Sequence, residues 1–167
     1  MIVVVMFFCL VCGAVLQAVW PTWLWLGQAS APFLLGLVLY YALSHGDGFM
    51  LLAAVLAGLL QDALGLIPLG YSSFCFCLTA LIVSRFREMV FSGDWPAHIL
   101  FGAVAAAGVS LVLSLLLSHD GRLLIGPGWT ILKAFGAGLL GAIVIPFEFR
   151  VLEALDRMLG NLHERGR

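Results

Sequence analysis

The stretch AGLLQDALGLIPLGYSSF, residues 57–74, decides the fold because it sets one acid inside a long apolar sequence. Asp62 is its only charged residue. Pro68 and Gly70 follow, and this pair predicts a break between two helices, since Pro ends a helix and Gly permits a tight reversal. Because the segments on both sides are apolar, the stretch predicts a helical hairpin with an acid near its tip.

The composition indicates a protein that lies in a lipid bilayer. The chain has 167 residues, of which 63% are hydrophobic and only 10% are charged, and its mean hydropathy is +1.12. Soluble domains have about 25% charged residues. The net charge is −1, and no run of basic residues is available to neutralise phosphates, so nucleic acid is excluded as a partner.

A helix needs about 20 apolar residues to cross the hydrocarbon core. By this criterion we expect an all-α polytopic protein with about six transmembrane helices, forming a bundle over residues 1–147. Five helices is the alternative if residues 22–44, which contain Gln28, Ser30 and Pro32, only dip into the membrane. The six expected segments are residues 2–20, 22–44, 48–67, 71–84, 97–118 and 129–147.

The placement of basic residues predicts the orientation of this bundle. With six helices, most basic residues fall on the side that holds both termini, and the positive-inside rule makes that side the cytoplasm. The inner group is Arg85, Arg87, Arg150, Arg157, Arg165 and Arg167, and the outer group is Arg122 and Lys133.

The last segment, residues 148–167, is expected to be a cytoplasmic amphipathic tail. Leu152, Leu155, Leu159 and Leu162 recur at helical spacing, and charges occupy the other face. Such a helix lies on the membrane surface, binds a partner, or caps the protein's own bundle.

The depth of Asp62 predicts how its carboxylate is stabilised. It follows Gly48 by 14 residues, which is about 21 Å of helix, so the acid lies below the outer surface of a core of about 30 Å. A carboxylate there is costly unless it is paired, hydrogen-bonded or protonated. We interpret Asp62 as an acceptor for backbone N–H groups around residues 65–71. The alternatives are an ion pair with Lys133 or Arg122, a ligand, ion or proton site, and a contact with a partner protein; Lys133 otherwise extends to the outer surface.

Small residues at helical spacing form stripes on two predicted helices. Such stripes let helices approach closely in a membrane. Each stripe fits either packing within the bundle or a binding surface for a partner helix. The stripes are Ala14 and Ala18 on the first helix, and Ala134, Gly138 and Gly141 on the last.

No pattern in the sequence predicts catalysis, a cofactor or a metal site. Cys9 and Cys12 have CxxC spacing, but neither a second such pair nor a pair of histidines accompanies them. The serines have no His or Asp at the spacing of a known motif. We therefore expect a protein that is not an enzyme.

The region around the acid resembles the signature of the rod shape-determining protein MreD family. Pro32, the turn at residues 46–48 and Phe49 add to the resemblance, which extends over nearly the whole chain. The residues that carry it form the pattern Gly58-x-x-x-Asp62-x-x-Gly65-x-x-Pro68-Leu69-Gly70.

The resemblance implies a non-enzymatic scaffold subunit of the bacterial cell-elongation complex, or elongasome, which directs peptidoglycan synthesis and cell shape. It implies an inner (cytoplasmic) membrane location, an MreC-like single-pass partner, and work alongside RodA, a class B penicillin-binding transpeptidase and MreB, in contact with membrane lipid. The signature residues Gly58, Asp62 and Gly70 then have an architectural role.

The family is also similar in fold to the S-components of energy-coupling-factor transporters. The alternative function is therefore a substrate-binding membrane subunit of a vitamin-type transporter. Such a subunit needs polar side chains in a central cavity, and the sequence offers few, which favours the scaffold. The candidates are Gln17, Gln28, Gln61, Asp62, Thr79 and Lys133.

Overall fold

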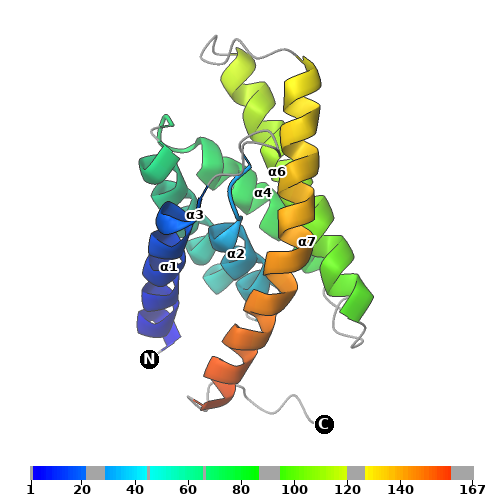
Figure 1. The fold of residues 1–167 in the computed structure, drawn as a ribbon. Helices are drawn as coiled ribbons and strands as arrows, with labels where there is room; N and C mark the ends of the chain where they lie inside the picture. Colours follow the sequence, from blue (N-terminus) through cyan, green and yellow to red (C-terminus); the bar gives the residue numbers. More distant parts are fainter. Residues whose placement is uncertain are drawn as a thin grey trace.

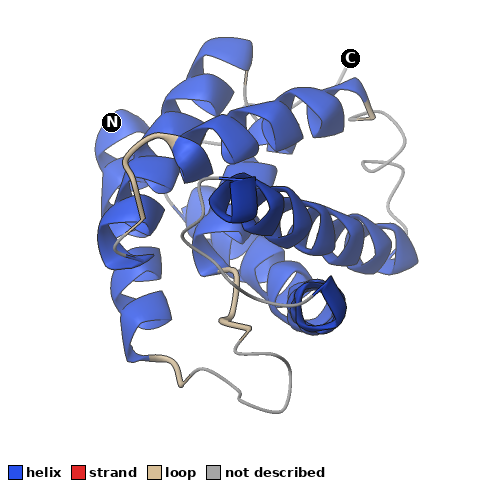
Figure 2. Cartoon of the chain, turned by 90° about the horizontal axis from the view of Figure 1, so that it is seen from above, coloured by secondary structure: helices blue, strands red, loops and turns tan. Residues whose placement is uncertain are grey.

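A computed structural model describes residues 2–21, 29–44, 46–65, 67–86, 95–119 and 127–158. Every regular element within these ranges is an α-helix, and none is a β-strand (Figure 2). The all-α fold is thus confirmed. The six helices of the described ranges are α1 (Ile2–Val19), α2 (Phe33–Ser44), α3 (Asp47–Gly65), α4 (Tyr71–Arg85), α6 (Trp95–His119) and α7 (Pro127–Met158) (Figure 1).

Three of these helices contain segments long and apolar enough to cross a membrane. The segments are Gly48–Gly65 in α3, His98–His119 in α6 and Gly128–Met158 in α7. The remaining apolar helices are shorter. The coarse prediction of helices long and apolar enough to cross a membrane is therefore confirmed, while the number of six crossings stays a prediction.

Helix α2 is a short helix at the centre of the bundle. It has 12 residues, or about 18 Å, well short of a hydrocarbon core of about 30 Å. Every residue from Leu34 to Leu43 is buried, and the helix contacts α1, α3, α4 and α7. Pro32 directly precedes it, a position where Pro suits a helix start. Of the predicted segment 22–44, only the C-terminal part is this helix, and residues 22–28 lie outside the described residues.

Small residues bring α6 and α7 into close contact where the two helices cross (Figure 1). A Cβ atom added to Gly141 would lie 2.6 Å from the Cβ of Ala106, and one added to Gly138 would lie 3.3 Å from the carbonyl oxygen of Ala103. Only the absence of side chains permits this approach. The stripe on the last predicted helix is thus used for packing inside the bundle.

Helix α7 is longer than the predicted last crossing. It runs through Pro146 to Met158 without a break, so the boundary predicted between residues 147 and 148 falls inside a helix. Leu152 and Asp156 are buried. Residues 148–158 therefore pack against the protein's own bundle, and residues 159–167 lie outside the described residues.

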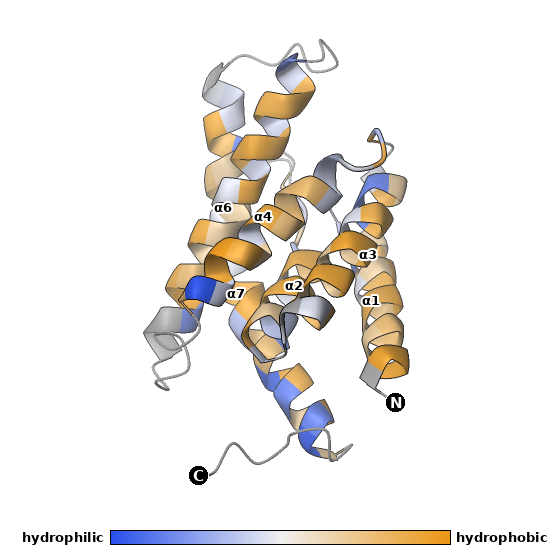
Figure 3. Ribbon diagram, turned by 180° about the vertical axis from the view of Figure 1, so that it is seen from behind, coloured by the Kyte–Doolittle hydropathy of each residue, from blue (hydrophilic) through white to orange (hydrophobic). Residues whose placement is uncertain are grey.

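The ends of the helices fall into two groups. The beginning of α1 and the end of α7 lie at one end of the molecule, and the end of α6 and the beginning of α7 lie at the other (Figure 1). The turn between α3 and α4 points toward the same end of the molecule as the beginning of α7 but stops short of it (Figure 1). Most residues of the helices are apolar, and hydrophilic residues gather at the C-terminal end of α7 (Figure 3).

Candidate functional site

The side chain of Asp62 links the end of α3 to the beginning of α4 through hydrogen bonds. Its side chain is fully buried. Oδ2 accepts a hydrogen bond from the backbone N–H of Gly70 at 2.7 Å, and Oδ1 accepts one from the N–H of Ser72 at 3.0 Å. The first N–H groups of a helix have no partner within it and favour a nearby negative charge. The expected backbone partners are thus present, and the carboxylate caps α4 from the preceding helix.

The turn between α3 and α4 owes its shape to the residues that follow Asp62. The N–H of Ile67 donates to the carbonyl of Asp62 at 3.1 Å, which closes the end of α3. Gly70 has φ 108°, in the left-handed region, where a side chain would be strained. Pro68 removes a donor that could have continued the helix. The break predicted at Pro68 and Gly70 is therefore a tight reversal.

Gly58 allows the two helices to touch through their backbones. A Cβ atom at this position would overlap the backbone N and Cα of Ser73 in α4. The hydroxyl of Ser73 in turn donates to the carbonyl of Val55 at 3.1 Å. At Gly65 an added Cβ would lie 3.0 Å from the side chain of Ile67, a contact that a rotation could relieve. Gly58, Asp62 and Gly70 are thus the three signature residues with stringent geometric roles.

The possible ion pair between Asp62 and Lys133 is absent from the described part of the chain. Both carboxylate oxygens of Asp62 bind backbone N–H groups, whereas Lys133 lines a cavity that Asp62 does not line. The other proposed partner, Arg122, lies outside the described residues. The physical reason is local: unpaired N–H groups eight and ten residues away satisfy the acid without a second charge.

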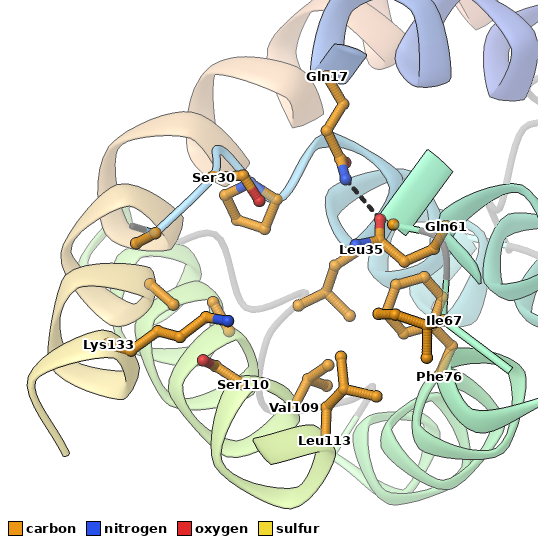
Figure 4. A pocket seen from close by; sticks show the side chains of 15 residues that line it. Gln17, Ser30, Leu35, Gln61, Ile67, Phe76, Val109, Ser110, Leu113 and Lys133 are labelled. Atoms are coloured by element: carbon orange, nitrogen blue, oxygen red, sulfur yellow. Dashed lines mark hydrogen bonds between the residues drawn. The ribbon is translucent and has the colours of Figure 1, made fainter. Parts of the chain in front are cut away.

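The cavity that Lys133 lines has a volume of about 260 Å³. Figure 4 shows Gln17 and Gln61 on one wall and Lys133 and Ser110 on the other. Gln17 donates to the side-chain oxygen of Gln61 and accepts from the N–H of Leu34 at 3.2 Å. Gln17 therefore caps α2 at the cavity wall.

The polar residues noted in the sequence divide between this cavity and other surroundings. Gln17, Gln61 and Lys133 line the cavity. Thr79 does not, and its hydroxyl donates to the carbonyl of Cys75 at 2.8 Å. Gln28 lies outside the described residues. The position of Ser110 beside Lys133 on one wall could not be predicted from the sequence, because the two residues are on different helices.

Two acids of the predicted tail, residues 148–167, are turned into the bundle: Asp156 is buried, and Glu148 is half-buried with its Oε2 atom buried. Asp156 accepts a hydrogen bond from the hydroxyl of Tyr40 at 2.6 Å. Glu148 lies against Gly36, and its Oε2 is buried without a hydrogen-bond partner in the described ranges. Both are one helical step of four residues from Leu152, so they share its buried face. That spacing was the available signal, but their charge made them read as solvent-exposed.

The remaining candidate residues are also placed. Ala134, Gly138 and Gly141 are buried against α6, so they present no surface to a partner helix. Ala14 is buried as well, and only Ala18 is exposed. Among the described residues, no group of three His, Cys, Asp or Glu side chains could hold a metal ion.

The described geometry offers hydrogen bonding and one positive charge at the cavity, and a fixed hairpin at Asp62. No family profile, curated protein or solved structure matches this chain.

Proposed function

We propose that this protein is a membrane scaffold subunit of the bacterial cell-elongation complex, as its resemblance to the MreD family implies. The observation that carries the proposal is the segment 58–70. Its pattern resembles the family signature, and Gly58, Asp62 and Gly70 together fix one helical hairpin. These three residues fix the backbone and are not available for a reaction. This suits a protein that binds partners through a rigid shape.

The proposed mechanism is binding within the inner membrane. Six crossings with both termini in the cytoplasm would present the apolar sides of α1 and α7 to lipid and to an MreC-like single-pass helix. Exposed side chains on these sides include Phe8 and Val15 on α1, and Phe135 and Ile143 on α7. RodA, a class B penicillin-binding transpeptidase and MreB would join through this assembly. The protein itself would carry out no reaction.

The test is co-purification of the tagged full-length protein in a mild detergent, with mass spectrometry of the bound proteins. We expect enrichment of an MreC-like single-pass protein and cell-wall synthases over an unrelated tagged multi-span protein. Depletion of the protein should convert rod-shaped cells to round ones. If depleted cells stay rod-shaped and no such partner is enriched, the proposal is wrong.

A second candidate is the substrate-binding subunit of a vitamin-type transporter. The observation that favours it is the cavity, which is lined by the polar side chains of Gln17, Gln61 and Lys133. The same co-purification separates the two candidates. Enrichment of ATP-binding-cassette ATPases with a shared transmembrane subunit would support the transporter.

A further inference from the structure

We propose that the cavity enclosed by α1, α2, α3, α4, α6 and α7 binds a small organic monoanion with an apolar middle, and that Lys133 holds the anionic group. This inference concerns a site and its ligand, and it does not depend on the scaffold function. The cavity of about 260 Å³ is close to the lower end of the range of ligand pockets, about 300–1,000 Å³. It therefore suits a metabolite-sized molecule or one lipid head group.

The charge of the cavity selects an anion. Lys133 is the only titratable residue among the lining side chains of the described ranges. It is half-buried, no acid is among the described residues that line the cavity, and Asp62, the acid predicted to pair with it, is bound to backbone N–H groups instead. A partly buried ammonium without a counter-charge is unfavourable. A single bound negative charge would compensate it.

The opposite wall adds hydrogen-bonding groups. Gln61 accepts a hydrogen bond from Gln17 through its side-chain oxygen, so its amide nitrogen is left as a donor. The beginning of α2 lies on this wall, since Gln17 binds the N–H of Leu34. The partial positive charge of a helix N-terminus also favours an acceptor atom there.

Apolar side chains line the cavity between its two polar walls (Figure 4). The labelled ones are Leu35, Ile67, Phe76, Val109 and Leu113. Pockets of this kind combine an apolar lining with a few polar groups that fix the orientation of the ligand. The expected ligand thus has an anion at Lys133 and Ser110, an apolar middle, and an acceptor near Gln61.

The first arm of the test uses 3-(4-hydroxyphenyl)propanoate and its uncharged amide as probes. Binding to the purified full-length protein in a neutral detergent is detected by saturation-transfer NMR. Titrating each probe into the protein gives its Kd. We expect the acid to bind at least tenfold more tightly than the amide. Lys133→Met should abolish this preference, and Ser110→Leu should weaken both probes by filling the cavity. Arg85→Gln removes an exposed charge at the end of α4 and should change nothing.

The second arm asks whether the anion is instead a lipid head group. Dihexanoyl phosphatidylglycerol is compared with dihexanoyl phosphatidylcholine in the same variants. A preference for the glycerol lipid that depends on Lys133, without a preference for the acid over the amide, supports the proposal with a lipid as the source. The reverse pattern supports it with a free small molecule as the source.

Either of two results would overturn the proposal. The first is that neither anionic probe binds better than its uncharged or zwitterionic counterpart in the wild-type protein, a comparison that requires no variant to fold. The second is that the preference persists in Lys133→Met.

Discussion

Asp62 shows how one residue can set the geometry of a hairpin. A buried carboxylate is costly unless it is satisfied, and here two N–H groups of the next helix satisfy it. The same bonds supply the cap that Gly70, which has no side chain, does not provide to α4. The Asp62 side chain, which lies in the last turn of α3, therefore satisfies its own buried charge and caps the beginning of α4.

Substituting Asp62 by Asn should destabilise the protein by about 1–3 kcal/mol. Asn has one acceptor oxygen, so its amide nitrogen would face the N–H of either Gly70 or Ser72. Thermal unfolding of the purified protein in detergent measures the effect. Glu153→Gln, which removes an exposed acid paired with Arg157, is the control and should cost less than about 1 kcal/mol. Equal unfolding temperatures for the two variants would contradict a stabilising role of Asp62 as the cap of α4.

Gly58→Ala should also destabilise the protein, by about 1–3 kcal/mol. The added Cβ meets the backbone of Ser73, which cannot rotate away as a side chain can. Gly108→Ala is the matched control, because a Cβ there meets nothing within 4 Å, and it should be neutral or stabilise slightly. Both are compared by thermal unfolding. If Gly58→Ala is as stable as Gly108→Ala, the two backbones are not in contact.

At this scale the sequence was informative only about neighbours along the chain. The hydrogen bonds of Asp62 were predictable because their donors lie within ten residues, beyond a break marked by Pro68 and Gly70. The alternative pairing with Lys133 was wrong because it needed knowledge of which helices meet. The cavity wall of Gln17 and Gln61 was unpredictable for the same reason.

Among the helices, α2 and α7 differ most from expectation. Hydropathy made residues 22–44 one crossing, but a helix buried on all sides can be short because other helices supply its surroundings. Hydropathy also ended the last crossing at residue 147, because Glu148 and Arg150 follow. Helix α7 continues since the buried face of its next turns, with Leu152 and Asp156, packs on α2 and its neighbours.

The end of α7 should depend on the hydrogen bond between Tyr40 and Asp156. Tyr40→Phe leaves a buried carboxylate without this donor and should cost about 1–3 kcal/mol. Hydrogen exchange of the amides in residues 148–158 should become faster, while α6 is unaffected. Glu153→Gln, on the exposed face of the same segment, is the control.

A double-mutant cycle isolates this bond from other effects of the substitutions. Tyr40→Phe combined with Asp156→Leu should cost less than the sum of the two single changes, by about 0.5–3 kcal/mol. Additive effects would mean that the two side chains do not interact.

For the whole molecule, both chain ends are expected in the cytoplasm. The beginning of α1 and the end of α7 share one end of the bundle (Figure 1), and the basic residues predicted on that side outnumber those on the other, so the positive-inside rule fixes its direction. A fluorescent protein fused after residue 167 should therefore fluoresce, and alkaline phosphatase inserted between α6 and α7 should be active. Phosphatase inserted between α4 and α6 should be inactive, since this linker is expected on the cytoplasmic side. A tag at the N-terminus separates six crossings from five, because with five it would lie outside while the C-terminal fusion still fluoresced.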